Sequence, residues 1–268
     1  MTGRPSATSA DKAQRIRVRF ARGIEATAIG HLDASRAWEN AFRHAGIQLS
    51  YSQGNRPTPR ITLAAGLGAN VTSDGELLDV ILAEFTDTST LIERVQPHLP
   101  LGLTPLDARE VGISLPALPT LVRWADYEVD VRVDDVAALR SRIEALLSQS
   151  TLPWVDTRGE KRREYDLRAL IGDILVEPIL KPAPSRSPFP LEKGARGLGP
   201  KAEIEPLCEG AARLSMRLRS DANGVGRPDQ VVKALALDEP SRIHRLRLII
   251  SETSPAHDAW RRRGRYTL

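Results

Sequence analysis

The residues best suited to chemistry in this sequence begin with a histidine and an aspartate. His31 and Asp33 stand two residues apart at the start of a helical pattern. An imidazole titrates near neutral pH, so His31 is a candidate general acid or base, metal ligand or phosphate contact. Asp33 is placed to cap the helix or to orient a neighbouring side chain. The structural alternative is that Asp33 caps the helix while His31 packs beside the first strand.

A polar loop at residues 51–60, Y-S-Q-G-N-R-P-T-P-R, follows this helical pattern. Its glycine permits close backbone approach, and its two prolines stiffen the chain. We expect its polar side chains to hold an anion or the edge of a nucleobase. The residues predicted to do so are Tyr51, Ser52, Asn55 and Arg60. The alternative is a rigid crossover whose polar groups satisfy their own backbone.

The first strand pattern, R-I-R-V-R-F, alternates basic and apolar residues and places Arg15, Arg17 and Arg19 on one face. If that face is open, it suits the phosphate backbone of RNA. RNA-binding sheets usually add aromatic side chains for base stacking, and only 4% of this chain is aromatic. The alternative is a charged strand face in contact with solvent.

A second charged strand pattern, K-R-R-E-Y-D-L-R, covers residues 161–168. Alternation places Asp166 and Arg168 on one face together with Glu164. A salt-bridge network between strands explains this pattern, and a contact to substrate or to a partner enzyme is the functional alternative.

The elements that must position these residues follow from hydrophobic periodicity. The first half has the order strand, helix, strand, strand, helix, strand, which is the split βαβ of the ferredoxin-like motif. We expect these elements at residues 15–20, 31–45, 61–67, 76–85, 88–98 and 103–111, with a turn at 72–75. The second half varies this order, with elements at 125–133, 136–147, 152–157, 164–170, 174–180, 212–219, 227–237 and 242–250.

The fold class predicted from this order is α+β, with two tandem ferredoxin-like units. The units are expected at residues 15–120 and 121–250, and a Pro/Gly-rich insertion at 181–206 interrupts the second. A disordered tail at residues 1–14 and a basic tail at residues 251–268 complete the predicted organisation.

The composition excludes several classes of protein. The 268 residues carry a formal net charge of +4, a mild excess that suits an anionic partner without requiring one. A single cysteine, Cys208, excludes a disulfide framework and a Cys-ligated metal centre held by this chain alone. Neither a signal peptide nor a membrane-spanning run of about 20 apolar residues is recognisable. We therefore expect a cytoplasmic protein with no metal, no cofactor of its own and no membrane partner.

Several motifs together resemble one protein family. They are G-H-L-D at residues 30–33, F-R-H-A-G at 42–46, the polar loop at 51–60, Y-D-L-R at 165–168 and G-V-G-R-P-D-Q-V-V-K-A-L at 224–235. The sequence resembles a radical-SAM-associated family of uncharacterised proteins, a domain of unknown function. Its members occur as free proteins or fused behind cobalamin-binding radical S-adenosylmethionine (SAM) proteins.

The resemblance covers residues 15–250, and the S-Q-G-N-x-P segment is its most specific part. The sequence departs from the family where Gly54 runs directly into Asn55 without an intervening aromatic, and at the insertion of residues 181–206. The resemblance implies an accessory protein of a cobalamin-dependent radical SAM enzyme and a connection with RNA modification. We interpret the chain as a non-catalytic accessory that positions RNA. The alternatives are a stand-alone RNA-processing or nucleotide-acting enzyme that uses His31, and a purely protein-binding adaptor.

Overall fold

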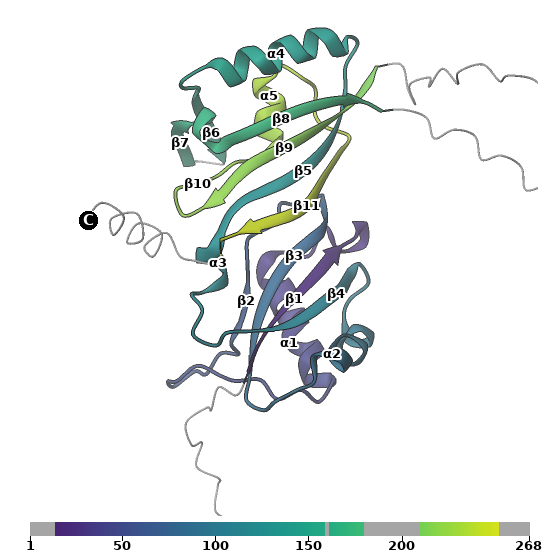
Figure 1. Ribbon diagram of the computed structural model, residues 1–268, viewed down its shortest axis with the longest axis vertical. Coiled ribbons are helices and arrows are strands. Elements are labelled where there is room, and N and C mark those ends of the chain that lie inside the picture. Colours follow the sequence, from purple (N-terminus) through teal and green to yellow (C-terminus); the bar gives the residue numbers. More distant parts are fainter. Residues whose placement is uncertain (1–13, 159–160, 180–209, 252–268) are drawn as a thin grey trace, which may run out of the picture. The chain divides into compact units, whose positions relative to one another are not determined.

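The computed structural model describes residues 14–158, 161–179 and 210–251, and shows an α+β protein (Figure 1). The described residues form five α-helices, and most strand pairs are antiparallel. The chain divides into two compact units. Unit 1 contains Met1–Tyr127, Arg217–Gly226 and Ile243–Leu268, and unit 2 contains Glu128–Met216 and Arg227–Arg242. The predicted fold class, α+β, is confirmed.

The elements up to the end of α3 lie in unit 1. They are β1 (Gln14–Arg22), a 3-10 helix (Ile24–Ala26), α1 (His31–His44), β2 (Ile61–Leu63), β3 (Val71–Leu82), α2 (Thr88–Val95), a 3-10 helix (Gln96–His98), β4 (Leu103–Val111) and α3 (Leu118–Leu121). Three later strands contribute residues to both units: β5 (Val122–Arg132), β9 (Ala211–Asp221) and β11 (Arg242–Ile250). The short strand β10 (Gly224–Val225) belongs to unit 1.

The strands of unit 1 pair in the order β10-β9-β5-β11-β3-β1-β4. β1 lies antiparallel between β3 and β4, and β2 is antiparallel to β3. β11 pairs in parallel with the beginning of β3, where Ile243 faces Val71 and Arg245 faces Ser73. The C-terminal described strand therefore joins β3 on the side away from β1.

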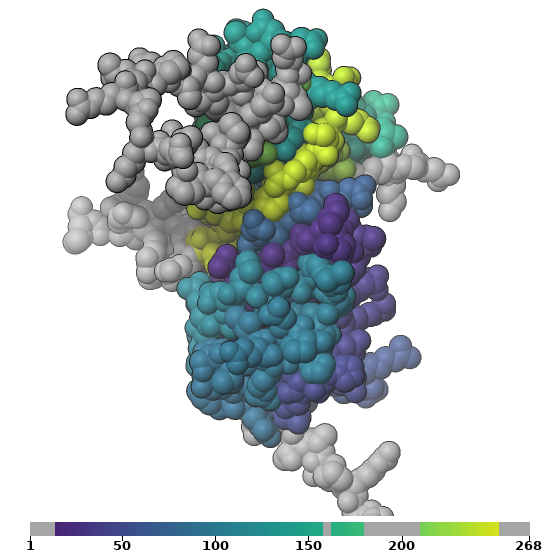
Figure 2. Space-filling view, turned by 90° about the vertical axis from the view of Figure 1, so that its right-hand side faces the viewer, coloured from purple at the N-terminus to yellow at the C-terminus, as the bar shows by residue number. Residues whose placement is uncertain are grey.

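The core of unit 1 lies between the sheet and helices α1 and α2 (Figure 1). In α1, Trp38, Ala41 and Phe42 follow the spacing that places apolar residues on one helix face, and all three are fully buried. The Trp38 ring packs edge-on against Phe20 of β1, with ring centroids 5.1 Å apart. Helix α1 ends where Gly46 adopts a positive φ of 68°, the backbone conformation that glycine adopts most readily. Figure 2 shows the face of unit 1 that carries α2 and β4.

The opposite face of β1 carries a buried ion-pair cluster. Arg15 and Arg17 are 5% and 4% exposed, and both donate to the carboxylate of Asp79 on β3. The two Nε–O distances are 2.9 Å and 2.7 Å. Arg15 also donates to the carbonyl oxygens of Leu115 and Pro116, in the segment that leads to α3. The cluster holds β1, β3 and this connecting segment together.

Two sequence predictions for unit 1 are wrong in detail. The turn expected at residues 72–75 lies inside β3, which starts at Val71. Gly75 accounts for this, because a Cβ there would lie 2.4 Å from the carbonyl oxygen of Leu246, so the missing side chain lets β11 approach. The strand expected at residues 61–67 ends at Leu63. Beyond it, the carbonyl group of Gly66 turns toward the Arg245 guanidinium.

Unit 2 contains the following complete elements: α4 (Val136–Ser148), β6 (Pro153–Arg158), β7 (Lys161–Asp166), a 3-10 helix (Arg168–Leu170), β8 (Ile171–Pro178) and α5 (Pro228–Ala234). β8 pairs with β9, while β6 and β7 form a separate antiparallel hairpin. Asp135 caps α4 by accepting from the backbone amides of Ala137 and Ala138.

The strand predicted at residues 164–170 is wrong beyond Asp166. The Asp166 carboxylate accepts from the backbone amides of Leu152 and Arg168. A short polar side chain that bonds its own backbone two residues on favours a turn over a strand. The chain therefore leaves β7 at this residue and forms the 3-10 helix.

Several sequence predictions lie outside the described residues. They concern the N-terminal tail up to residue 13, the insertion at 181–206 with Cys208 beyond it, and the C-terminal tail from residue 252. Gln14, which was predicted to belong to the tail, is the first residue of β1. No helix in the described part of the chain has the length and apolar character needed to cross a membrane.

Removal of Asp79 is expected to destabilise the protein strongly. In Asp79→Ala, two buried guanidiniums lose their counter-charge, and breaking a buried pair in this way costs about 3–5 kcal/mol. Urea unfolding compares this variant with Asp107→Ala, which alters an exposed aspartate on β4 and is expected to cost less than about 0.5 kcal/mol. A loss below about 1 kcal/mol for Asp79→Ala would contradict the role of the cluster. The triple variant Arg15→Met, Arg17→Met, Asp79→Leu is expected to regain most of the stability.

Candidate functional site

The arginines predicted to contact phosphate fall into two groups in the structure. Arg15 and Arg17 are buried and paired with Asp79, so this side of β1 is closed at both positions. Arg19 is exposed on the same strand. Of the three predicted arginines, Arg19 alone lies at the surface.

His31 and Asp33 occupy the first turn of α1, and both are exposed. The N-cap residue is Gly30, whose extended backbone starts the helix without a side-chain cap. Asp33 instead pairs with Arg36 across one helical turn, at 3.1 Å between oxygen and nitrogen. Asp33 is therefore a surface partner of Arg36, and the expected capping bond is absent from the described contacts.

The polar loop is tied together largely by its own backbone. The Ser52 hydroxyl lies 3.0 Å from the Thr58 hydroxyl and accepts from the Thr58 amide. The Arg60 guanidinium donates to the Tyr51 carbonyl group at 3.2 Å, and the Tyr51 side chain packs against the core of unit 1. Asn55 at the tip is exposed. Ser52, Tyr51 and Arg60 therefore have the contacts of a rigid crossover.

A hollow in unit 1 brings His31 close to two buried charged residues. Its volume of about 30 Å³ suits about two water molecules. Apolar side chains, including Phe20 of β1, form most of the wall, and Arg22, Glu76 and His31 supply the polar groups. Burial lowers the pKa of Arg22, against the charge of Glu76, which raises it. Arg22 donates to the carbonyl groups of Ala26 and Thr27.

The hollow and the polar loop lie at different positions along β3. Glu76 lines the hollow, whereas Ile81 accepts from the Ser50 amide and donates to the Arg60 carbonyl group at the base of the loop. The five-residue step from Glu76 to Ile81 along β3 spans about 17 Å at the rise of an extended strand. Among the candidate residues of the first helix and the polar loop, His31 lines the hollow, whereas Asp33, Tyr51, Ser52, Asn55 and Arg60 do not.

Asp166 and Arg168 both bind backbone in unit 2. Asp166 accepts the two amide bonds that end β7. The Arg168 guanidinium donates to the carbonyl groups of Leu147 and Ile171. The Arg168 contacts join the end of α4 to the start of β8. Both Asp166 and Arg168 therefore have a structural role.

Sequence reasoning did not identify the buried ion pair formed by Glu76, which lines the hollow. Arg245 is 1% exposed and donates to both carboxylate oxygens of Glu76. It also donates to the Gly66 carbonyl group at 3.1 Å and to the Tyr127 hydroxyl at 3.5 Å. Burial alone lowers the pKa of Arg245, but the charge of Glu76 and the contact with Tyr127 raise it overall. The Arg245 guanidinium therefore neutralises the charge of Glu76 within unit 1.

Sequence reasoning also missed a group of residues on a solvent-facing part of unit 1. We call it the tryptophan–arginine surface: Trp124 and Asp126 of β5, Arg217 and Arg219 of β9, and Arg247 of β11. Trp124 and Asp126 alternate with the buried Ala125 and Tyr127, so they share the other face of β5.

The contacts within this surface are well defined. Arg217 and Arg247 donate to the Asp126 carboxylate, with Nε–O distances of 2.8 Å and 2.9 Å. The Arg219 guanidinium lies over the Trp124 ring, 5.6 Å from its centroid. The side chain of Arg247 is 65% exposed and that of Arg217 is 44% exposed, whereas that of Asp126 is 13% exposed. The guanidiniums therefore face solvent more than the carboxylate they share.

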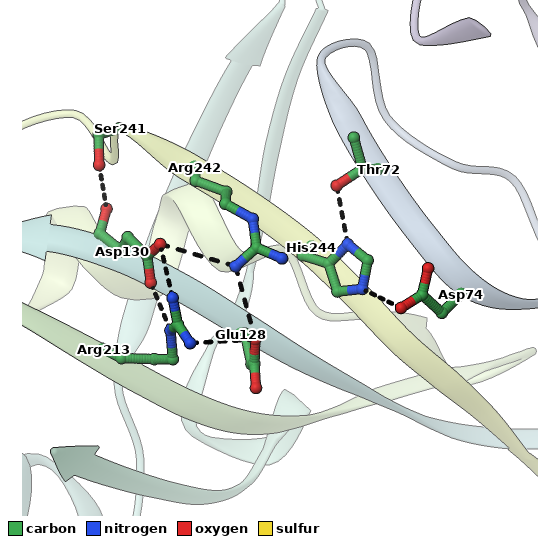
Figure 3. A network of polar contacts seen from close by, with 8 residues as sticks. All are labelled: Thr72, Asp74, Glu128, Asp130, Arg213, Ser241, Arg242 and His244. Carbon is green, nitrogen blue, oxygen red and sulfur yellow. Dashed lines mark hydrogen bonds and ion pairs between the residues drawn. The ribbon is translucent and has the colours of Figure 1, made fainter. Parts of the chain in front are cut away.

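Two further polar networks are drawn in Figure 3. In unit 1, the His244 ring lies between Thr72 and Asp74. Its Nδ1 is 2.8 Å from the Thr72 hydroxyl, and its Nε2 is 3.2 Å from the Asp74 carboxylate. In unit 2, Asp130 pairs with Arg213 and Arg242. The first network ties β11 to β3, and the second ties residues of β5, β9 and β11 that belong to unit 2.

The sequence carries a weak signal for the tryptophan–arginine surface. The segment W-A-D-Y-E-V-D at residues 124–130 alternates polar and apolar residues, and R-L-R at 217–219 does the same. Trp124 lies one residue before the strand predicted at 125–133. That these two segments lie side by side depends on the strand order, which periodicity does not specify.

We expect a contribution of Asp126 to stability that disappears in acid. Partial burial raises the pKa of Asp126, but hydrogen bonds from Arg217 and Arg247 outweigh this and lower the pKa below the ordinary 3.8. A lowered pKa means that the stabilisation is complete above that ordinary value and is lost as the pH falls through the folded-state pKa. Because the site is partly exposed, the contribution is about 1 kcal/mol or less.

Urea unfolding of the wild type and Asp126→Asn between pH 7 and pH 3 measures this effect. The difference in unfolding free energy between the two proteins is expected to be constant near neutral pH and to shrink below about pH 4. A difference that stays constant down to pH 3 would mean that the Asp126 charge makes no contribution.

Among the described residues, no three His, Cys, Asp or Glu side chains are grouped closely enough to hold a metal ion. The comparison with curated proteins gave no match. The model of one protein family, described as "Uncharacterized protein conserved in bacteria (DUF2344)", matches residues 15–188. This match spans β1 to β8 and covers more than half of the chain. The chain therefore belongs to this conserved bacterial family.

Proposed function

We propose that this protein is a non-catalytic accessory that binds RNA and positions it for a cobalamin-dependent radical SAM enzyme. The observation that carries the RNA part of the proposal is the tryptophan–arginine surface. In it, two guanidiniums share the Asp126 carboxylate, and a third, on Arg219, lies over the Trp124 indole and pairs with Asp221. Guanidinium groups match the geometry of phosphate, and aromatic rings stack on bases.

The charge balance of this surface favours a polyanion. Asp126 is shared by Arg217 and Arg247, so one negative charge is set against two positive charges at the most exposed part of the surface. Arginine that binds phosphate releases counterions from the nucleic acid, which drives association. Phosphate oxygens of RNA would accept hydrogen bonds from the solvent-facing guanidinium groups of this surface.

The partner is proposed from the resemblance to radical-SAM-associated proteins together with the cysteine content of the chain. An iron–sulfur cluster held by cysteines takes about four thiolates, and this chain contains one cysteine. The proposal therefore assigns the cluster, the cobalamin and the radical chemistry to the partner. This chain contributes the arginines and the aromatic ring that hold RNA.

We infer that the two predicted tandem units are each ferredoxin-like. The strand order supports this, because β4-β1-β3-β2 and β11-β5-β9-β8 are the same arrangement. In each set, the first strand in sequence lies between the third and fourth, and the second lies at an edge. This is the arrangement of the split βαβ motif. The β6–β7 hairpin is then an insertion between α4 and β8 of the second unit.

The second candidate function is a stand-alone enzyme that acts on RNA or a nucleotide through His31. The observation that favours it is the hollow, which brings His31 together with Arg22 and Glu76. An imidazole and a buried guanidinium that line one hollow suit general acid–base chemistry on a phosphate ester. His31→Ala separates the candidates, because only an enzyme would lose RNA cleavage in this variant.

The RNA proposal predicts a salt-dependent affinity that depends on the surface arginines. Fluorescence anisotropy with a labelled RNA oligonucleotide measures the dissociation constant across salt concentrations. In Arg217→Gln and in Arg247→Gln, the slope of log affinity against log salt is expected to fall by about 1, and affinity is expected to fall for all sequences.

Arg162→Gln is the matched control for these variants. Arg162 lies on β7, its side chain is 66% exposed, and it pairs with Glu164, so affinity and slope are expected to stay at the wild-type values. Absence of RNA binding by the wild type at low salt would overturn the proposal. Equal losses in Arg162→Gln and Arg247→Gln would show that RNA binding is not specific to the tryptophan–arginine surface.

A further inference from the structure

We propose that Trp124 stacks against an unpaired base, so that the RNA held by the tryptophan–arginine surface is single-stranded. This inference rests on the proposed RNA-binding function and names the form of RNA that the surface accepts. The surface combines two chemistries on adjacent strands, a π-face on β5 and guanidiniums on β9 and β11.

The position of Trp124 differs from that of a core tryptophan. Trp38 is fully buried between Phe20 and Phe42. Trp124 is half-buried on the face of β5 that also carries Asp126, and its described ring contact is the guanidinium of Arg219. A large aromatic ring at a partly exposed position, bordered by cations, is typical of platforms that bind single strands.

The spacing along the strands places stacking beside phosphate binding. Trp124 and Asp126 are separated by two residues on β5, and Arg219 and Arg217 are separated by two residues on β9. Two residues of extended strand span about 7 Å. A nucleotide with its base on Trp124 would therefore have the Arg217–Asp126–Arg247 group within reach of its backbone phosphates.

Arg219 is suited to change partners when a base arrives. Its Nε is buried without a hydrogen-bond partner among the described residues, and its ion pair with Asp221 is long, at 3.8 Å between nitrogen and oxygen. An arginine held by a ring contact and a long ion pair, without a hydrogen bond at Nε, loses little when it moves aside or stacks on the incoming base, because both a base and a guanidinium bind a π-face.

The geometry discriminates against a duplex. In an A-form helix, the bases are stacked inside and only their edges and the 2′-hydroxyl groups reach the minor groove. A tryptophan that lies against a sheet has no access to a base face in such a helix. Phosphate contacts alone would remain, so a duplex would use Arg217 and Arg247 without Trp124.

The test compares three polyanions and four proteins by fluorescence anisotropy at one low salt concentration. The polyanions are a 12-nucleotide oligouridine, a 12-base-pair RNA duplex and heparin, which carries negative charge without bases. The proteins are the wild type, Trp124→Leu, Trp124→Phe and Trp154→Leu. Trp154 is a half-buried tryptophan on β6 of unit 2, so Trp154→Leu is a matched control. Circular dichroism checks that each variant is folded.

The inference predicts that Trp124→Leu weakens oligouridine binding about tenfold, the size of effect expected for one lost stacked base. Affinity for the duplex and for heparin is expected to stay within about twofold of the wild type. Trp124→Phe keeps a smaller ring and is expected to fall between the wild type and Trp124→Leu. Trp154→Leu is expected to bind all three polyanions as the wild type does.

Two outcomes overturn the inference in distinguishable ways. If the wild type binds single strand and duplex equally and Trp124→Leu changes neither, or changes all three polyanions equally, the stacking role is wrong while RNA binding stands. If the wild type binds none of the three, the proposed function fails and this inference fails with it.

Discussion

The buried contact between Arg245 and Glu76 is the interaction on which the arrangement of unit 1 depends. It joins residues separated by 169 positions in the sequence, and both side chains are almost completely buried. A buried pair contributes little net stability, yet removal of either partner leaves an uncompensated charge in the interior. The pair therefore favours the placement of β11 beside β3, where both groups are neutralised. Gly75 makes that placement possible, because a side chain there would collide with the β11 backbone.

This constraint also determines which arginines remain available for a ligand. In the interior, Arg15 and Arg17 form ion pairs with Asp79, and Arg245 forms an ion pair with Glu76. With β11 held against β3, Arg247 reaches Asp126 on β5 from one side while Arg217 reaches it from β9. The basic character of the chain is thus divided between buried arginines that hold strands together and exposed arginines that surround one carboxylate. The site proposed for RNA is a consequence of strand order.

Periodicity predicted the bounds of helices and strands better than it predicted which of their charged residues are buried. Strands β4 and β11 have the predicted bounds, and α1 ends one residue before the predicted end, because amphipathic patterns and the glycine at residue 46 are local signals. The predicted role of Arg15 and Arg17 depended on an open face, and R-I-R-V-R-F does not reveal that Asp79, 64 residues from Arg15, neutralises both. Strand pairing between distant segments decides which charged residue is buried, and no local pattern encodes it.

The same limit applies to the candidate site. His31 was singled out by its position at the start of a helix, and it lines a hollow, but the residues of the polar loop do not line it, because the base of the loop contacts Ile81, further along β3. Trp124 and Arg219 were overlooked because they are 95 positions apart and meet only through the pairing of β5 with β9. The aromatic ring that the charged face of β1 lacks is supplied by β5, a strand from the middle of the chain.

The most direct test of the central claim is ultraviolet crosslinking in native cell lysate, followed by capture of the tagged full-length chain and mass spectrometry of its peptides and partners. The account predicts that nucleotide adducts occur on the β5 and β9 peptides that contain Trp124 and Arg219, and that a radical SAM protein is captured together with the chain. Adducts confined to the polar loop at residues 51–60, or the absence of any RNA adduct, would contradict it.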